Sequence, residues 1–188
     1  IAGLEKGKIE SENLEEELAT CKEQLEAAKN KLFKPIFGCE MYVARRRMFH
    51  RDGKADQSGY HLVVLAKNEK GYQNISKLNA IAFRDGFHFK PRIDYDILEK
   101  YSEGLVCLSA CLAGEVPRYI EKGLIGEAEK AALRYQESFG KGNYFLELQD
   151  HGIPMQQTVN MALLNMSKKL DIPLVCTNDV HYTYADDV

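Results

Sequence analysis

Several features that would narrow the function at once are scarce or missing in this chain of 188 residues. It has no tryptophan and five prolines, and no apolar run approaches the roughly 20 residues that span a bilayer. Ile1 opens no recognisable signal peptide, so we expect a cytoplasmic protein without a membrane partner. Because the net charge is −3, any contact with nucleic acid has to be local or metal-mediated.

The five cysteines are an odd number and form no Cys-x-x-Cys pair, which argues against a disulfide framework and a structural zinc knuckle. Cys39, Cys107 and Cys176 lie in apolar strand-like runs, where a free cysteine usually acts as a small hydrophobe, so we expect them in the core. Cys21 lies in a helical segment. Cys111 follows a predicted strand in a loop and is therefore the cysteine best placed to be a ligand.

Residues 1–32 contain no aromatic residue or proline and are rich in Glu, Lys, Leu and Ala. Apolar residues recur there at alternating spacings of three and four, which predicts one long helix with a coiled-coil-like seam. The seam consists of Leu14, Leu18, Cys21, Leu25, Ala28 and Leu32. Asn13 and Glu16 could form a capping box where the helix begins firmly. With so few heptads, an amphipathic helix packed on a barrel fits equally well.

From Phe33 onward, short apolar runs alternate with helical patterns, and the connections between them are short. The predicted strands are residues 35–43, 60–66, 105–109, 144–149 and a last one from Val175. The predicted helices are residues 72–84, 116–121, 125–139 and 155–170, together with a short one that Asp94 caps and that ends near Tyr101. Such alternation favours a mainly parallel sheet, barrel-like or doubly wound. We therefore divide the chain into residues 1–32 and an α/β domain of residues 33–188.

Four polar residues at strands are candidates for chemistry. Asp179 and His181 follow the last strand, where α/β folds keep their binding sites, and their carboxylate and imidazole suit zinc, manganese or iron. Glu40 interrupts an apolar strand, in which an unpaired carboxylate would be costly, and His61 lies at the start of the next. The alternatives are a helix cap for Asp179, a surface position for His181, an ion pair with Arg or Lys for Glu40, and a hydrogen-bonded core histidine for His61.

Two further segments could contact a substrate. Residues 45–51 interleave four arginines with Met, Phe and His, so Arg45 and Arg47 could grip phosphates, although a solvated loop explains the pattern as well. Asp150 and His151 follow the fourth predicted strand and could touch a substrate or form a turn into the next helix.

Short motifs run in order through the second segment: Lys34–Val43, His61–Asn68, Gly71–Asn74, Lys90–Asp94, Glu103–Leu105, Leu108–Leu112, Leu146–Gln149 and Thr177–Tyr182. Together they resemble the PHP (polymerase and histidinol phosphatase) domain of bacterial DNA polymerase III alpha subunits. The resemblance covers the chain from about Phe33 to its end, in too many ordered motifs for chance.

This resemblance implies a distorted (β/α)7-type barrel whose cleft holds up to three divalent metal ions, with zinc or manganese expected and magnesium as a further candidate. By position, it assigns metal ligands to Glu40, His61, Cys111, Asp179 and His181. Clustered divalent ions support 3'-5' exonuclease or phosphoesterase chemistry in some members of the family, and in others the domain is a scaffold. The implied parent is a DNA-directed DNA polymerase, a nucleotidyltransferase of DNA replication, with DNA and other polymerase or proofreading subunits as partners.

The departures from the family pattern concern the first segment. The family begins with a His-x-His strand, a further acidic ligand and a strand ending in Asp-His, and none of these precedes Lys34. The two missing β/α units would need roughly 60 residues, about twice the 32 that precede Phe33. We interpret residues 1–32 as a foreign, fused helix; a natural truncation and a wrongly assigned segment are the alternatives.

We therefore expect an incomplete (β/α)7-type PHP barrel preceded by a long N-terminal amphipathic helix, with one weakly held metal ion and no activity of its own. No catalytic residue can be named from the sequence. A structural or oligomerisation module is the second hypothesis, in which the helix of residues 1–32 pairs with another copy of the chain. An unrelated metal-dependent barrel hydrolase is the third.

Overall fold

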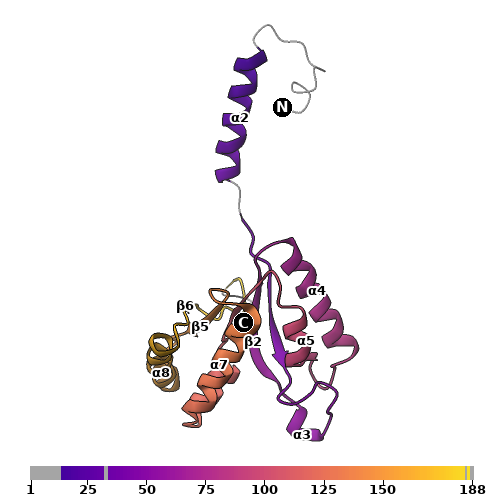
Figure 1. The fold of residues 1–188 in the computed structure, drawn as a ribbon, viewed down its shortest axis with the longest axis vertical. Coiled ribbons are helices and arrows are strands. Elements are labelled where there is room, and N and C mark those ends of the chain that lie inside the picture. The colour runs from indigo at the N-terminus through magenta and orange to yellow at the C-terminus, as the bar shows by residue number, and fades with distance from the viewer. Residues whose placement is uncertain (1–13, 32–33, 185, 187–188) are drawn as a thin grey trace. The chain divides into compact units, whose positions relative to one another are not determined.

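The fold was analysed in a computed structural model, which describes residues 14–31, 34–184 and 186. It separates into two compact units that meet between Pro35 and Ile36, and each is described by itself. Within the first unit, α2 (Leu14–Lys31) is a helix whose first turn carries three glutamates, a charge that favours a helix N-terminus (Figure 1). Asn13 of the expected capping box and Leu32 of the expected seam lie outside the described residues.

The second unit is built on one six-stranded sheet with the order β3-β1-β2-β4-β5-β6, which does not close into a barrel. Its strands are β1 (Gly38–Val43), β2 (Tyr60–Ala66), β3 (Arg92–Ile93), β4 (Leu105–Leu108), β5 (Tyr144–Leu148) and β6 (Leu174–Cys176). The pairs β1–β3, β4–β5 and β5–β6 are parallel, as the alternation of strands and helices predicts. The mixed α/β fold and the incomplete barrel are thus confirmed.

One strand departs from the expected direction, because β2 is antiparallel to both of its neighbours, β1 and β4. The connection from β1 to β2 contains only α3 (Gly53–Asp56), a single helical turn. A parallel return needs a crossover element long enough to pack along the sheet, so the chain comes back beside β1 as in a hairpin.

Five longer helices accompany the strands: α4 (Glu69–Arg84), α5 (Tyr95–Lys100), α6 (Glu115–Glu121), α7 (Ile125–Phe139) and α8 (Pro154–Leu170). The side chain of Asn68 caps α4 by accepting from the Gly71 N–H, and that of Asp94 caps α5 by accepting from the Ile97 N–H. α4 packs beside β2, α7 packs against β4 and β5, and α8 packs against β5, as Figure 1 shows for α4 and α8. None of the helices described here is long and apolar enough to cross a membrane.

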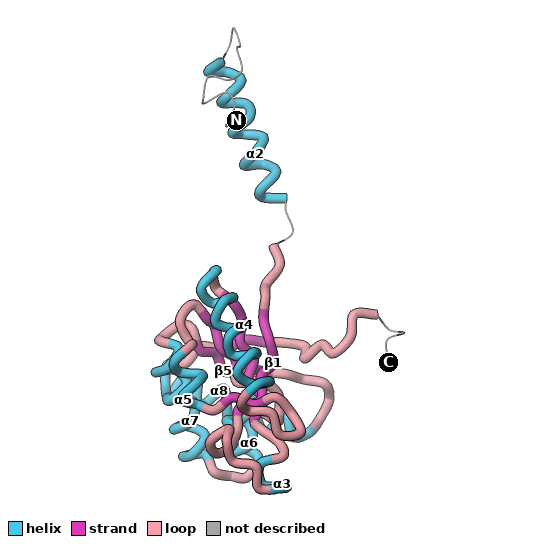
Figure 2. The backbone as a smooth tube through the Cα atoms, turned by 90° about the vertical axis from the view of Figure 1, so that its right-hand side faces the viewer, coloured by secondary structure: helices cyan, strands magenta, loops and turns pink. Residues whose placement is uncertain are grey.

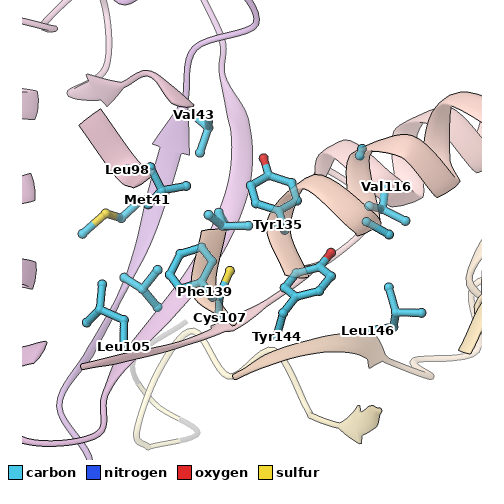
Figure 3. Packing of buried hydrophobic residues seen from close by; sticks show 14 of the residues in the cluster. Met41, Val43, Leu98, Leu105, Cys107, Val116, Tyr135, Phe139, Tyr144 and Leu146 are labelled. Atoms are coloured by element: carbon cyan, nitrogen blue, oxygen red, sulfur yellow. The ribbon is translucent and has the colours of Figure 1, made fainter. Parts of the chain in front are cut away.

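A single core lies between the helices and one face of the sheet. Met41 on β1 and Leu62 on β2 point into it, and so do residues of β4, β5, α4, α7 and α8. Figure 3 shows Tyr135 of α7 and Tyr144 of β5 side by side there, with ring centroids 5.5 Å apart. Because side chains alternate along a strand, Glu40 and His61 point to the opposite face, which the core does not cover.

The burial of the three cysteines that were expected in the core differs from one to the next. Cys107 is fully buried and Cys39 is half-buried, but Cys176 is exposed, so the prediction that it lies in the core is wrong. Its strand, β6, is only three residues long and is the last in the sheet order, so its apolar sequence does not reach the interior.

Candidate metal centre

The geometry of the uncovered sheet face brings Glu40 and His61 together. In the β1–β2 pair, Glu40 lies opposite Val63 and Tyr42 lies opposite His61, so the two functional side chains are diagonal neighbours on one face. His61 Nδ1 lies 2.9 Å from Glu40 Oε1. The Tyr42 ring meets the imidazole edge to face, with centroids 5.0 Å apart, and so restrains its orientation.

Cys111 reaches the same place from the loop after β4. The backbone N–H of His61 donates to the Ala113 carbonyl, which connects this loop to the start of β2. The loop is tight: a Cβ on Gly114 would lie 2.1 Å from the Ser109 oxygen, so only glycine fits there. As a result Cys111 Sγ lies 3.6 Å from the same His61 Nδ1 that faces Glu40.

The electrostatics of the three groups reflect their proximity. The Cys111 sulfur and the Glu40 carboxylate raise the pKa of His61 to about 10, since both stabilise a proton on its ring. The hydrogen bond to His61 holds the pKa of Glu40 below its ordinary value, and the charge of His181 lowers it further.

The donor set fits a divalent metal ion. One ligand atom each from Glu40, His61 and Cys111 lie within 4.8 Å of one another. Carboxylate oxygen, imidazole nitrogen and thiolate sulfur are zinc ligands, and at bond lengths of about 2.0–2.3 Å the ligand atoms of a tetrahedral site lie roughly 3.3–3.8 Å apart. The Nδ1–Oε1 and Nδ1–Sγ separations of 2.9 and 3.6 Å are close to that range.

Asp179 and His181, the other two expected ligands, do not belong to this group of three. They lie in the chain beyond β6, which Figure 2 shows as a loop. His181 Nδ1 lies 2.8 Å from the Asp179 carbonyl, and residues 180–184, which follow Asp179 directly, form no helix for it to cap. The charge of His181 nevertheless lowers the pKa of Glu40, so His181 lies within electrostatic range of that carboxylate.

The arginine loop between β1 and β2 is held by ion pairs. Arg47 Nε lies 2.7 Å from Asp94 Oδ2, and Arg46 pairs with Asp56. Arg45 donates to Ser58 Oγ and lies over the Tyr60 ring. The expected substrate contacts Arg45 and Arg47 thus line a cavity of about 200 Å³ that also contains carboxylates.

The buried side chain of Arg92 on β3 also holds this loop, although nothing in the sequence pattern marked it as a functional residue. It is 1% exposed and donates to four backbone carbonyls, those of Gly86, Met48, His50 and Asp56.

The Asp150–His151 pair forms a turn that joins two loops. Asp150 accepts from the Gly152 N–H, and His151 exchanges two hydrogen bonds with the buried Gln156. Since Gln156 Nε2 donates to His151 Nδ1, the other ring nitrogen is left to donate to the Asn178 carbonyl, 2.9 Å away. His151 therefore connects the turn after β5 with the loop after β6.

A second carboxylate in a strand was also overlooked. Glu147 is 5% exposed on β5 and forms a network with Gln149 and Thr177. The signal that pointed to Glu40, a charge within an apolar strand, was present for Glu147 as well.

Comparison of the sequence with known proteins relates the chain to one family. The model of the PHP domain family matches residues 11–151. DNA polymerase III subunit alpha of Treponema pallidum is 46% identical over 155 residues, which are 82% of this chain and 13% of that protein. The corresponding subunit of Borreliella burgdorferi is 45% identical over 163 residues, 85% of this chain and 14% of that protein, and that of Aquifex aeolicus is 40% identical over 167 residues, 86% and 14%. The chain thus spans about one seventh of the length of these curated relatives.

Proposed function

Because the chain belongs to the PHP domain family, we propose that it is the metal-binding PHP portion of a bacterial replicative DNA polymerase. In this proposal its parent acts in DNA replication, as a DNA-directed DNA polymerase whose partners are DNA and other polymerase or proofreading subunits. The relatives that carry the similarity are alpha subunits of DNA polymerase III, which supports this reading.

The observation that carries the metal-binding part is the convergence of Glu40, His61 and Cys111. The three come from β1, β2 and the loop after β4, and their ligand atoms lie within 4.8 Å of one another. We assign Asp179 and His181 as further ligands, supported by the effect of His181 on the pKa of Glu40. Zinc or manganese suits this mixture of oxygen, nitrogen and sulfur better than magnesium, which prefers oxygen alone.

The residues of the chain have distinct tasks in this site. His61 would bind through Nδ1, because both other donors face that nitrogen, and Nδ1 would have to be free of its proton to be a ligand. Glu40 would supply a carboxylate oxygen and Cys111 a thiolate sulfur to the same ion. A bound divalent ion supplies Lewis acidity, which activates water and stabilises charge on a phosphoryl oxygen.

Hydrolytic activity is not part of the proposal for this chain. The sequence contains no His-x-His pair, the motif that opens the ligand set of the family. Of its five histidines, His61 lies in the candidate centre and His181 lies within electrostatic range of Glu40. We therefore propose one metal ion held by these residues, without the ion cluster that phosphoesterase or 3'-5' exonuclease chemistry requires.

Metal analysis of the purified chain tests this proposal. After incubation with Zn²⁺ or Mn²⁺ and dialysis, the wild type should retain about one equivalent of metal and His61→Ala should lose it, because its Nδ1 is the shared ligand atom. His50→Ala is the matched control, since His50 is an exposed histidine outside the group of three.

Wild-type protein that retains no metal would overturn metal binding.

The same samples should not hydrolyse a phosphate monoester or a 3'-terminal nucleotide. Metal-dependent hydrolysis that disappears in the double variant Asp179→Asn, His181→Ala would show that the inactive assignment is wrong.

We also propose the division of the chain into a helical segment, residues 1–32, and a PHP segment, residues 33–188. The boundary between compact units at Pro35 and Ile36 supports it, while the family match from residue 11 overlaps the helix. Within the seam, Leu25 is 45% exposed, so an apolar side chain is available for pairing. Pairing of α2 with a second copy, and a foreign origin for it, remain predictions.

A further inference from the structure

Glu147 is a buried carboxylate that the candidate metal centre does not use. It is 5% exposed and lies near the end of β5, the strand between β4 and β6. In the described part of the chain it forms no ion pair with a lysine, arginine or histidine. Burying a carboxylate without a cationic partner is costly, so its presence calls for an explanation.

One oxygen of Glu147 holds the loop after β6. Its Oε1 accepts from the Thr177 hydroxyl and, at 3.0 Å, from Gln149 Nε2. The Thr177 N–H donates to the Leu148 carbonyl, so this residue is fastened to β5 by both backbone and side chain. Thr177 stands two residues before Asp179 and four before His181.

The other side of Glu147 faces the loop that carries Cys111. Its backbone N–H donates to Ser109 Oγ over 2.8 Å, two residues before Cys111. Its second oxygen, Oε2, and Gln149 Oε1 have no partner among the described residues. Glu147, Gln149 and Cys111 line a common cavity of about 10 Å³, which is room for roughly one water molecule. The carboxyl group therefore lies between the two loops that present candidate ligands.

Both loops contain a residue in a strained backbone conformation, which precedes a candidate ligand in one loop and is itself a candidate ligand in the other. Ala110 has φ 62°, immediately before Cys111, and Asp179 has φ 46°. Non-glycine residues adopt this left-handed region at an energetic cost, so the surrounding structure has to hold them there. Thr177, which donates to the Glu147 carboxyl group, lies two residues before Asp179. Ser109, which accepts from the Glu147 backbone N–H, lies one residue before Ala110.

We propose that Glu147 is a positioning residue of the metal centre, which fixes the loop of residues 109–111 and the loop of residues 177–181 relative to each other. This inference rests on the proposed metal-binding function. Its carboxyl group holds Thr177 through one oxygen and faces the Cys111 cavity with the other. Cys111 and the Asp179–His181 pair are thereby presented to one ion.

Zinc affinity of the full chain, measured by competition with a chromogenic chelator, tests the proposal. Thr177→Val removes the hydroxyl bound by Glu147 at nearly constant volume and should weaken zinc binding about tenfold or more. Glu147→Leu should have a similar effect, because it fills the space without accepting hydrogen bonds. Glu147→Gln keeps an acceptor for Thr177 and should stay within about threefold of the wild type.

Thr158→Val is the matched control, because the Thr158 hydroxyl donates only to the Pro154 carbonyl on the exposed side of α8. It should leave zinc affinity unchanged. Thermal unfolding of the metal-free variants separates positioning from loss of fold, and if Glu147→Leu does not fold, Thr177→Val alone decides.

If Thr177→Val folds and binds zinc as tightly as the wild type, the positioning role is overturned while metal binding stands. If the wild type itself binds no zinc, the proposed function is overturned, and this inference with it.

Discussion

The residues of the centre illustrate what a strand pattern can and cannot reveal. Glu40 stands out because it is a carboxylate in an apolar run. Its partner, His61, is harder to identify from the sequence. His61 lies 21 positions later and reaches Glu40 through the register of β1 and β2, two strands that pair antiparallel where a mainly parallel sheet was expected. Cys111 could be placed in a loop but not oriented, because the turn depends on Ala110 in a left-handed conformation and on Gly114.

At the same scale, Asp56 provides a test of the ion pairs that hold the arginine loop. Its hydrogen bonds from Arg46, and then from the Asp52 N–H, lower the pKa of Asp56 from 3.8 to about 2. Since the folded state favours the ionised form, its stabilising effect is present above about pH 4 and is lost as the pH falls toward 2. Asp56→Asn should therefore lower stability at pH 7, and its difference from the wild type should narrow in acid.

Urea unfolding of both proteins from pH 7 to pH 2.5 measures this difference. In an Arg46→Met background, Asp56→Asn should have a much smaller effect, because the main partner is already gone. If the difference in unfolding free energy between wild type and Asp56→Asn is the same at every pH, the lowered pKa of Asp56 is contradicted.

At the scale of elements, the longer helices and strands could be predicted closely. The expected strand 60–66 and helix 125–139 coincide with β2 and α7, since each has a clear apolar period and flanking turn residues. The structure adds β3 and α3, which are two and four residues long and too short to show a period. The direction of β2 departs from the expected parallel arrangement, because the connection from β1 contains only the four residues of α3 and no helix long enough for a parallel crossover.

The start of α4 depends on close contact with the turn before β4. A Cβ on Gly71 would lie 1.9 Å from the Gly104 oxygen, and the Lys67 N–H donates to that same oxygen. Gly71→Ala should therefore destabilise the fold by about 3 kcal/mol, because helix and turn would have to separate.

Gly126→Ala is the matched substitution, since Gly126 also lies in a helix, α7, and its added methyl group would meet nothing within 4 Å. It should stabilise the protein by up to about 1 kcal/mol through helix propensity. Chemical denaturation of the two variants beside the wild type compares them. If both substitutions change the unfolding free energy equally, the close contact between Gly71 and Gly104 is not what requires glycine at position 71.

At the scale of the whole molecule, the open sheet explains the form of the candidate centre. The helices pack against one face, which leaves Glu40 and His61 on the other. The three candidate ligands come from the neighbouring strands β1 and β2 and from the loop after β4. Asp179 and His181 follow β6, which is at the end of the sheet order and away from β1 and β2. Their assignment to the candidate centre therefore depends more on the sequence motif than on their position in the structure. The family match covers most of the chain, yet the chain is about one seventh of its relatives.

The most direct test of the central claim, that Glu40, His61 and Cys111 together hold a metal ion, is a Co²⁺ titration followed by absorption. A thiolate bound to cobalt gives a charge-transfer band in the near ultraviolet. The wild type should develop this band with saturation at about one equivalent, Cys111→Ser should lose it, and Cys176→Ser should keep it, although Cys176 is the more exposed thiol. A band that survives Cys111→Ser, or a wild type that shows none, would contradict the claim.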